Sequence, residues 1–123
     1  MNIYEDPRII NPLKRIDNLE LRYLNLSEIS QGGPEIGNFY INGQLIDGKF
    51  GGPFIFQKPY IYIPAFSKKM FSRGFVLARI DITTNAIEYK GKIEPLIFLN
   101  KIIDNKIYYY KDIEKKVEGV FEL

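Results

Sequence analysis

The chain contains neither cysteine nor histidine. Without cysteine it has no disulfide bonds, no thiolate nucleophile and no cysteine ligand for a metal. Without histidine it has no Ser-His-Asp triad, no histidine general base and no histidine metal site. Catalysis would have to use carboxylate, hydroxyl, amine or phenol groups. We therefore predict a protein that is not an enzyme and that holds no metal and no cofactor.

Signals for membranes and nucleic acids are also missing. Residues 1–7 lack the basic segment and apolar run that begin a signal peptide, and no stretch approaches the roughly 18 apolar residues of a membrane span. The 17 basic and 15 acidic residues give a net charge of +2, which is too balanced for the basic stripe of a nucleic-acid-binding domain. We expect a cytoplasmic protein that binds neither nucleic acid nor membrane.

The abundant residues favour β-structure. The chain has nine Tyr and nine Phe, and isoleucine is its dominant aliphatic residue. Aromatic and β-branched side chains suit a pleated, half-buried surface and lose rotamer freedom in a helix. Alanine, the best helix former, occurs only at Ala65, Ala78 and Ala86. At 123 residues the chain fits one domain, so we predict a single β-rich domain over residues 1–123.

Alternation of apolar and polar residues predicts a series of short strands. Residues 1–18 carry two prolines and no clear periodicity, so we expect a less regular N-terminal segment there. Turn signals recur roughly every 8–12 residues afterwards, which is typical of consecutive antiparallel hairpins. We predict an all-β fold, an antiparallel meander that forms a sandwich or a partly open barrel. The strand candidates are residues 19–24, 36–41, 54–56, 60–63, 74–82, 87–90, 96–99, 107–110 and 117–121.

Glycine marks the predicted turns. The Asn-Gly pair at 42–43 and the Asp-Gly pair at 47–48 are both strong signals for type I′ hairpins. A Gly-Gly-Pro sequence occurs at 32–34 and again at 51–53, each time before an aromatic strand. In both copies we expect glycine to supply a positive φ and proline to fix the direction of the exit.

The fold leaves room for one short helix. Residues 27–31 could form a helical turn, and residues 112–116 could form another, with Asp112 as its N-cap. Neither segment is long enough to support a helical domain.

Tyrosines give the positive evidence for a binding surface. Tyr60 and Tyr62 share one face of a predicted strand, and Tyr108 and Tyr110 share one face of another. If the isoleucines that alternate with them point inward, these tyrosines stand on the outer surface, unless both faces of the sheet are buried. Tyrosine offers a large contact area at low entropic cost, so we predict these residues as partner contacts.

Charged residues add further candidates. Arg73 and Arg79 are predicted partner contacts because arginine is a favoured anchor in interfaces, although Arg79 could equally pair with Asp81 on the same strand face. Asp81 and Glu88 flank a predicted turn and could lie close enough for a glycosidase-type pair. Their spacing does not single them out from other exposed acids, so we treat such an enzyme as a lesser alternative.

The middle of the chain resembles small bacterial immunity proteins. The pattern is the Gly-Gly-Pro at 51–53, the Tyr-Ile-Pro at 62–64, the segment Gly-Phe-x-Leu-Ala-x-Ile-Asp at 74–81 and the three tyrosines at 108–110. Such proteins neutralise the toxins of contact-dependent growth inhibition and related polymorphic toxin systems. The resemblance covers about half of the chain, and it implies a cytoplasmic protein that binds a cognate toxin domain and occludes its active site. Separately, we expect the protein to be monomeric when free. Many such proteins are acidic, whereas this chain is mildly basic.

Two further classes of function stay open at this stage. A small ligand-binding or carbohydrate-binding β-module could use exposed tyrosines as stacking platforms. A structural subunit could pair an exposed edge strand with another copy. The resemblance favours the protein-binding hypothesis over both.

Overall fold

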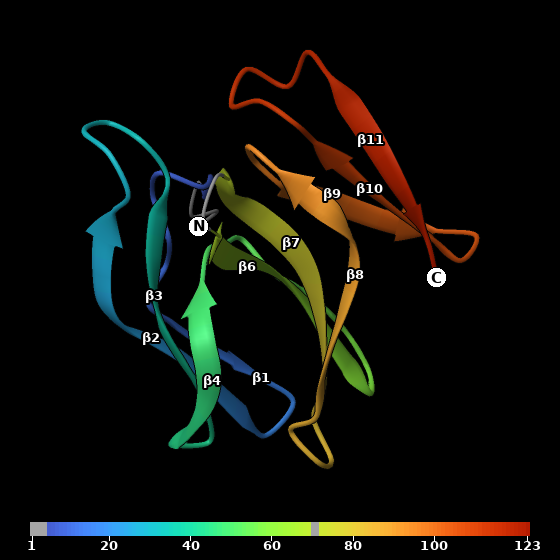
Figure 1. Ribbon diagram of the computed structural model, residues 1–123. Helices are drawn as coiled ribbons and strands as arrows, with labels where there is room; N and C mark the ends of the chain where they lie inside the picture. Colours follow the sequence, from blue (N-terminus) through green and yellow to red (C-terminus); the bar gives the residue numbers. More distant parts are fainter. Residues whose placement is uncertain (1–4, 70–71) are drawn as a thin grey trace.

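The computed structural model describes residues 5–69 and 72–123 and confirms the all-β meander. Its strands follow one another in a series of hairpins (Figure 1). They are β1 (Leu13–Ile16), β2 (Leu19–Glu28), β3 (Glu35–Ile41), β4 (Gln44–Phe50), β5 (Ile55–Gln57), β6 (Tyr60–Lys69), β7 (Ser72–Asp81), β8 (Ile87–Glu94), β9 (Phe98–Ile103), β10 (Lys106–Tyr110) and β11 (Glu118–Glu122).

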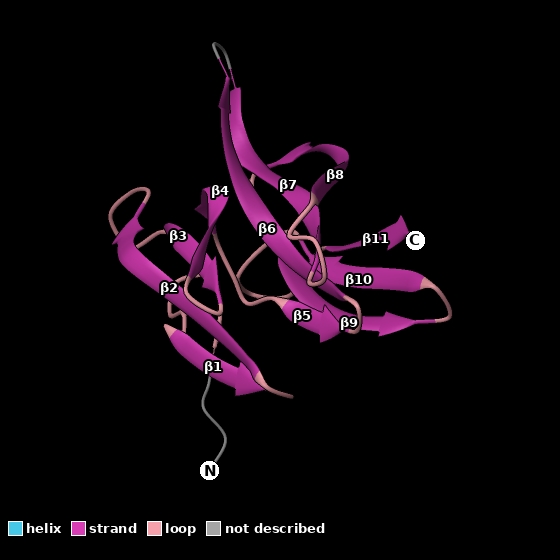
Figure 2. Cartoon of the chain, turned by 90° about the horizontal axis from the view of Figure 1, so that it is seen from below, coloured by secondary structure: helices cyan, strands magenta, loops and turns pink. Residues whose placement is uncertain are grey.

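The strands form two antiparallel sheets. The large sheet has the order β1-β2-β3-β4-β6-β7-β8, with β5 paired to β6, and it curls into a half-barrel. The small sheet has the order β11-β10-β9. Figure 2 shows β6 and β7 between strands β1–β4 on one side and β9–β10 on the other. The β6–β7 hairpin is therefore the central element of the molecule.

Each face of the β6–β7 hairpin supports its own hydrophobic core. The inner face of the half-barrel buries Ile61, Ile63 and Ile80 with residues of β2, β3 and β4. The opposite face buries Phe75 and Leu77, with other residues, against the small sheet. The alternation of side chains along a strand explains the division, since consecutive residues point to opposite faces.

Pro64 lies where β6 changes neighbours along one of its edges. Tyr60–Tyr62 pair with β5, whereas Ala65 pairs with Phe50 of β4. The carbonyl of Pro64 accepts the Gly51 amide at 2.8 Å. A proline cannot donate to a sheet ladder, so it is tolerated at this change of partner.

The two predicted hairpin signals have different outcomes. Residues 42–43 close the β3–β4 hairpin, with φ of 50° at Asn42 and 80° at Gly43, as a type I′ turn requires. The prediction of a turn at 47–48 is wrong, because both residues lie inside β4. Gly48 has φ of 122°, and the register against β3 shifts beside it. Residues 47–48 therefore belong to a β-bulge in β4 instead of a hairpin turn.

The two Gly-Gly-Pro sequences also differ. Gly32 has a positive φ of 73°, as predicted, but neither glycine of the second copy has one. Instead, a Cβ atom at Gly51 would lie 2.9 Å from the Phe75 ring, and one at Gly52 would lie 2.9 Å from the Tyr23 hydroxyl. The second copy therefore uses glycine for close packing rather than for its conformational freedom.

The prediction of a short helix is wrong within the described residues, which form no helix. Residues 27–28 end β2, residues 29–31 form bends and a turn, and residues 112–115 form turns and bends. Asp112 accepts the amides of Lys116 and Val117, four and five residues later. An N-cap side chain would instead accept an amide two or three residues later.

The N-terminal segment is more regular than expected, because residues 13–16 form β1 on the edge of the half-barrel. Before β1, the Tyr23 amide donates to Pro12 and the Glu35 amide donates to Pro7, at 2.8 and 2.7 Å. These two hydrogen bonds hold the segment against β2 and β3. The two prolines cannot donate backbone hydrogen bonds, but their carbonyls accept them.

Candidate functional site

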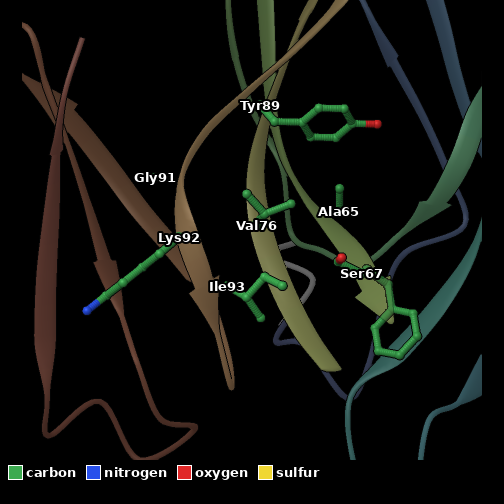
Figure 3. A pocket seen from close by; sticks show the side chains of 8 residues that line it. Ala65, Ser67, Val76, Tyr89, Gly91, Lys92 and Ile93 are labelled. Carbon is green, nitrogen blue, oxygen red and sulfur yellow. The ribbon is translucent and has the colours of Figure 1, made fainter. Parts of the chain in front are cut away.

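An apolar groove with a volume of about 660 Å³ lies on the inner face of β6, β7 and β8. The cross-strand pair Ala65 and Val76 lies at its floor, and Tyr89 and Ile93 come from β8. Figure 3 shows the side chains of Tyr89 and Ile93 on the groove side of the sheet, whereas Lys92 points the other way. The Tyr89 residue is 58% exposed. The groove thus offers an accessible apolar surface that includes two aromatic side chains, Phe66 and Tyr89.

A bulge in β8 shapes this groove. Phe75 and Leu77 of β7 pair with Glu94 and Lys90 of β8, so three residues of β8 lie opposite a single residue of β7. Gly91 begins the bulge with φ of 78°, a conformation that favours glycine. Bulges bend the strand that carries them and redirect its side chains. The bend carries Ile93 to the groove.

β8 is also an edge strand. It is the last strand of the large sheet and pairs only with β7 among the described strands. Within residues 5–69 and 72–123, no backbone hydrogen bond joins the outer side of Ile87–Lys90 to another segment. An edge of this kind can accept a further strand. The bulge limits the regular stretch to Ile87–Lys90.

A second pocket of about 260 Å³ lies beside the same strand, lined by Tyr60, Arg79, Asp81, Ala86 and Glu88. Arg79 and Glu88 are cross-strand partners and form an ion pair through the arginine Nη2 and the glutamate Oε2. The arginine guanidinium lies 4.3 Å from the centre of the Tyr60 ring. Its side chain is 23% exposed, whereas that of Glu88 is 62% exposed. The guanidinium of Arg79 is therefore fixed by both the Glu88 carboxylate and the Tyr60 ring.

The protonation of this second pocket follows from its contacts. Burial lowers the pKa of Arg79, but the hydrogen bond and charge of Glu88, with contacts to Tyr60 and Tyr62, raise that pKa above its ordinary value. The Thr83 hydroxyl, followed by the Thr83 amide, lowers the pKa of Asp81, and the charge of Arg79 adds to this effect. Asp81 Oδ1 accepts both Thr83 groups, at 2.6 and 2.8 Å. Asp81 is therefore a carboxylate at neutral pH.

The structure brings together three of the predicted contact residues, Tyr60, Tyr62 and Arg79. The expected exposure of Tyr62 is wrong, because this residue is only 4% exposed. The small sheet covers the outer face of β6 at this point, so Tyr62 belongs to the second core. The expected pairing of Arg79 with Asp81 is also replaced by the ion pair with Glu88 on the neighbouring strand.

The other predicted contacts lie elsewhere. Tyr108 and Tyr110 are half-buried on β10, with the ammonium of Lys101 5.7 Å from the Tyr108 ring and that of Lys115 6.0 Å from the Tyr110 ring. Arg73 is exposed near the start of β7 and donates to the Ile29 carbonyl at 3.2 Å. These residues stay predicted partner contacts, but they do not belong to either pocket.

Sequence reasoning missed Tyr89 and the groove beside it. The sequence predicts a strand over residues 87–90 but gives no functional signal there. The groove combines residues of three strands and depends on a register shift. The alternation in Ile87-Glu88-Tyr89-Lys90 could have identified Tyr89 as a residue on the same face as Ile87, but not its exposure.

No family model, curated protein or solved structure matches the chain in the three comparisons made. Within the part of the chain that the structure describes, no three acidic side chains are grouped so that they could hold a metal ion. No helix among the same residues has the length and apolar character needed to cross a membrane.

Proposed function

We propose that this protein is a non-catalytic binding protein whose ligand is another protein, and that β8 is the centre of its binding surface. The observation that carries the proposal is that two pockets open on opposite faces of one edge strand, β8, which pairs only with β7 among the described strands. Tyr89 lines the groove on one face, and its neighbour Glu88 lines the Arg79 pocket on the other.

The chemistry of these pockets is that of protein interfaces. Binding energy is concentrated in a few Tyr, Trp and Arg anchors that become desolvated in well-packed pockets. Arg79 and Tyr60 are already stacked on one another, so little side-chain entropy is lost when a partner covers them. The apolar groove can take an aliphatic or aromatic side chain of the partner.

The specific form of the proposal is an immunity protein that binds and neutralises a cognate bacterial toxin domain. Its support is the resemblance noted for residues 51–110, which include Tyr60, Arg79 and Tyr89. A protein that blocks the active site of a toxin needs an exposed anchor surface and no catalytic groups of its own. The absence of histidine and cysteine from the sequence agrees with that requirement.

The experiment is to co-express the chain with the C-terminal domain of a large toxin encoded beside its gene. We expect restored growth of the toxin-expressing cells and a stable complex on size-exclusion chromatography. Tyr89→Ala should weaken the complex at least tenfold, whereas Leu45→Ala, at a similarly exposed apolar residue on β4, should not. A lack of both growth rescue and complex formation would reject the immunity function.

A small ligand-binding module is a second candidate, favoured by one observation. The groove volume of about 660 Å³ lies within the usual range of small-molecule sites, and Tyr89 is exposed enough to stack against a sugar ring. A glycan array tests this alternative. Saturable binding that Tyr89→Ala abolishes would favour the ligand-binding module over the protein-binding proposal.

A further inference from the structure

We infer, resting on the proposed protein-binding function, that β8 takes an extended segment of the partner in which a basic residue lies next to an apolar one. The basic side chain enters the Arg79 pocket, and the apolar side chain enters the groove. The inference is carried by the charge of the Arg79 pocket and by the alternation of Glu88 and Tyr89 along the edge strand.

The Arg79 pocket carries an excess of negative charge. Its lining includes the carboxylates of Asp81 and Glu88 and the single guanidinium of Arg79. The guanidinium is already paired with Glu88 and lies against the Tyr60 ring. Glu88 is largely exposed, so its carboxylate is available to a cation that approaches from solvent. Opposite charges in an interface guide both encounter and specificity.

Other ligands fit this pocket less well. An anion would have to displace Glu88 from Arg79 and would then lie near Asp81. A bare metal ion lacks a group of three acidic ligands in the part of the chain that the structure describes, and it would meet the positive charge of Arg79. A lysine or arginine side chain needs neither rearrangement, because the lining already presents two carboxylates, those of Asp81 and Glu88.

The strand edge relates the two pockets. In antiparallel pairing, side chains directly opposite one another lie on the same face of the sheet. A partner residue opposite Glu88 therefore points towards the Arg79 pocket, and the adjacent residue, opposite Tyr89, points towards the groove. Lys90 shares the face of Glu88 and disfavours a second basic residue opposite it. The bulge at Gly91 ends the regular pairing there.

The test uses three short synthetic peptides, blocked at both ends, in which valine and threonine alternate and one central threonine is kept or replaced by lysine or glutamate. Binding to the ¹⁵N-labelled protein is followed by NMR. We expect the amides of Ile87–Lys90 to shift and the lysine peptide to bind about three to ten times more tightly than the glutamate peptide. Asp81→Asn with Glu88→Gln should abolish this preference, while Glu114→Gln on a distant turn should leave it unchanged.

Tyr89→Ala separates the two pockets, because it should weaken all three peptides by a similar factor and keep the preference for lysine. Equal binding of the lysine and glutamate peptides, shifts confined to another surface, or no binding of any peptide would each overturn the inference. None of these results would contradict the proposed function if the toxin domain still forms a complex. Failure of that complex while the lysine preference holds would instead reject the immunity function alone.

Discussion

The Tyr109 hydroxyl donates a hydrogen bond to Oε2 of Glu94, and this bond connects the two sheets. Glu94 ends β8 in the half-barrel, and Tyr109 is the next-to-last residue of β10, the middle strand of the small sheet. Both residues are buried. Tyr109 also stacks on Phe121 of β11, with ring centres 4.6 Å apart. A polar contact at this junction fixes the small sheet in one position, because a slip of the sheet would leave a buried carboxylate without its donor.

Tyr109→Phe should destabilise the fold by about 1–3 kcal/mol, since it removes the hydroxyl donor and leaves the buried Glu94 with the more distant Lys111 ammonium at 3.9 Å. Urea unfolding monitored by circular dichroism gives the free energy. Tyr108→Phe on the same strand is the matched control and should change it by less than about 0.5 kcal/mol. Similar losses for both variants would mean that the Glu94 contact contributes nothing specific.

Alkaline pH should destabilise the protein through the same residue. Burial, followed by the hydrogen bond and charge of Glu94, raises the pKa of Tyr109 above its ordinary value. The stabilisation is therefore intact below about pH 10, where tyrosine ionises in the unfolded chain, and is lost as the pH rises towards the folded pKa. The urea midpoint should fall as the pH is raised from about 8 to about 11. In Tyr109→Phe the midpoint should depend less steeply on pH. Some slope should persist because burial also raises the pKa of Tyr23 well above its ordinary value.

Gly91→Ala tests the bulge that shapes the groove. The new Cβ atom would lie 2.6 Å from Cε1 of Phe121, at a residue with φ of 78°. Gly43→Ala is a close control, because Gly43 has φ of 80° and nothing within 4 Å of the added atom. Backbone strain should cost each variant about 1–2 kcal/mol, and the steric contact should cost Gly91→Ala roughly 1–3 kcal/mol more. Equal losses in thermal or urea unfolding would show that the Phe121 ring moves aside freely.

The charge of Asp81 should depend on Thr83. Because the Thr83 hydroxyl is the largest cause of the lowered pKa of Asp81, Thr83→Val should raise this pKa towards its ordinary value near 4. A carboxyl ¹³C NMR titration measures the change directly. With a lowered pKa, the contribution of Asp81 to stability is present above about pH 4 and is lost as the pH falls through the folded pKa. An unchanged titration in Thr83→Val would assign the effect to the Thr83 amide and to Arg79.

Local sequence signals predicted much of the fold. The Asn-Gly pair at 42–43 occupies a two-residue hairpin loop with positive φ at both positions, as predicted, because both residues tolerate that conformation. The pair at 47–48 carries the same signal but lies within β4. There, pairing with β3 on one side of the strand outweighs the local preference.

The candidate site was harder to predict because it depends on contacts between distant segments. Alternation correctly put Tyr62 on the face opposite Ile61 and Ile63, but its burial depends on a sheet that begins at Phe98. The ion-pair partner of Arg79 is Glu88 on the neighbouring strand β8, rather than Asp81 two residues along its own strand. The groove likewise requires the bulge in β8, which neither composition nor periodicity indicates.

The use of β6 and β7 by both cores has a consequence for solubility. A chain shortened before Leu96 would keep every strand of the half-barrel, but it would expose Tyr62, Phe75 and Leu77 to water. Long paired strands with a contiguous apolar face are prone to self-association. The small sheet thus shields an apolar face of the half-barrel from water. Substitutions that destabilise β9, β10 or β11 should therefore cause aggregation before they cause a loss of β-structure.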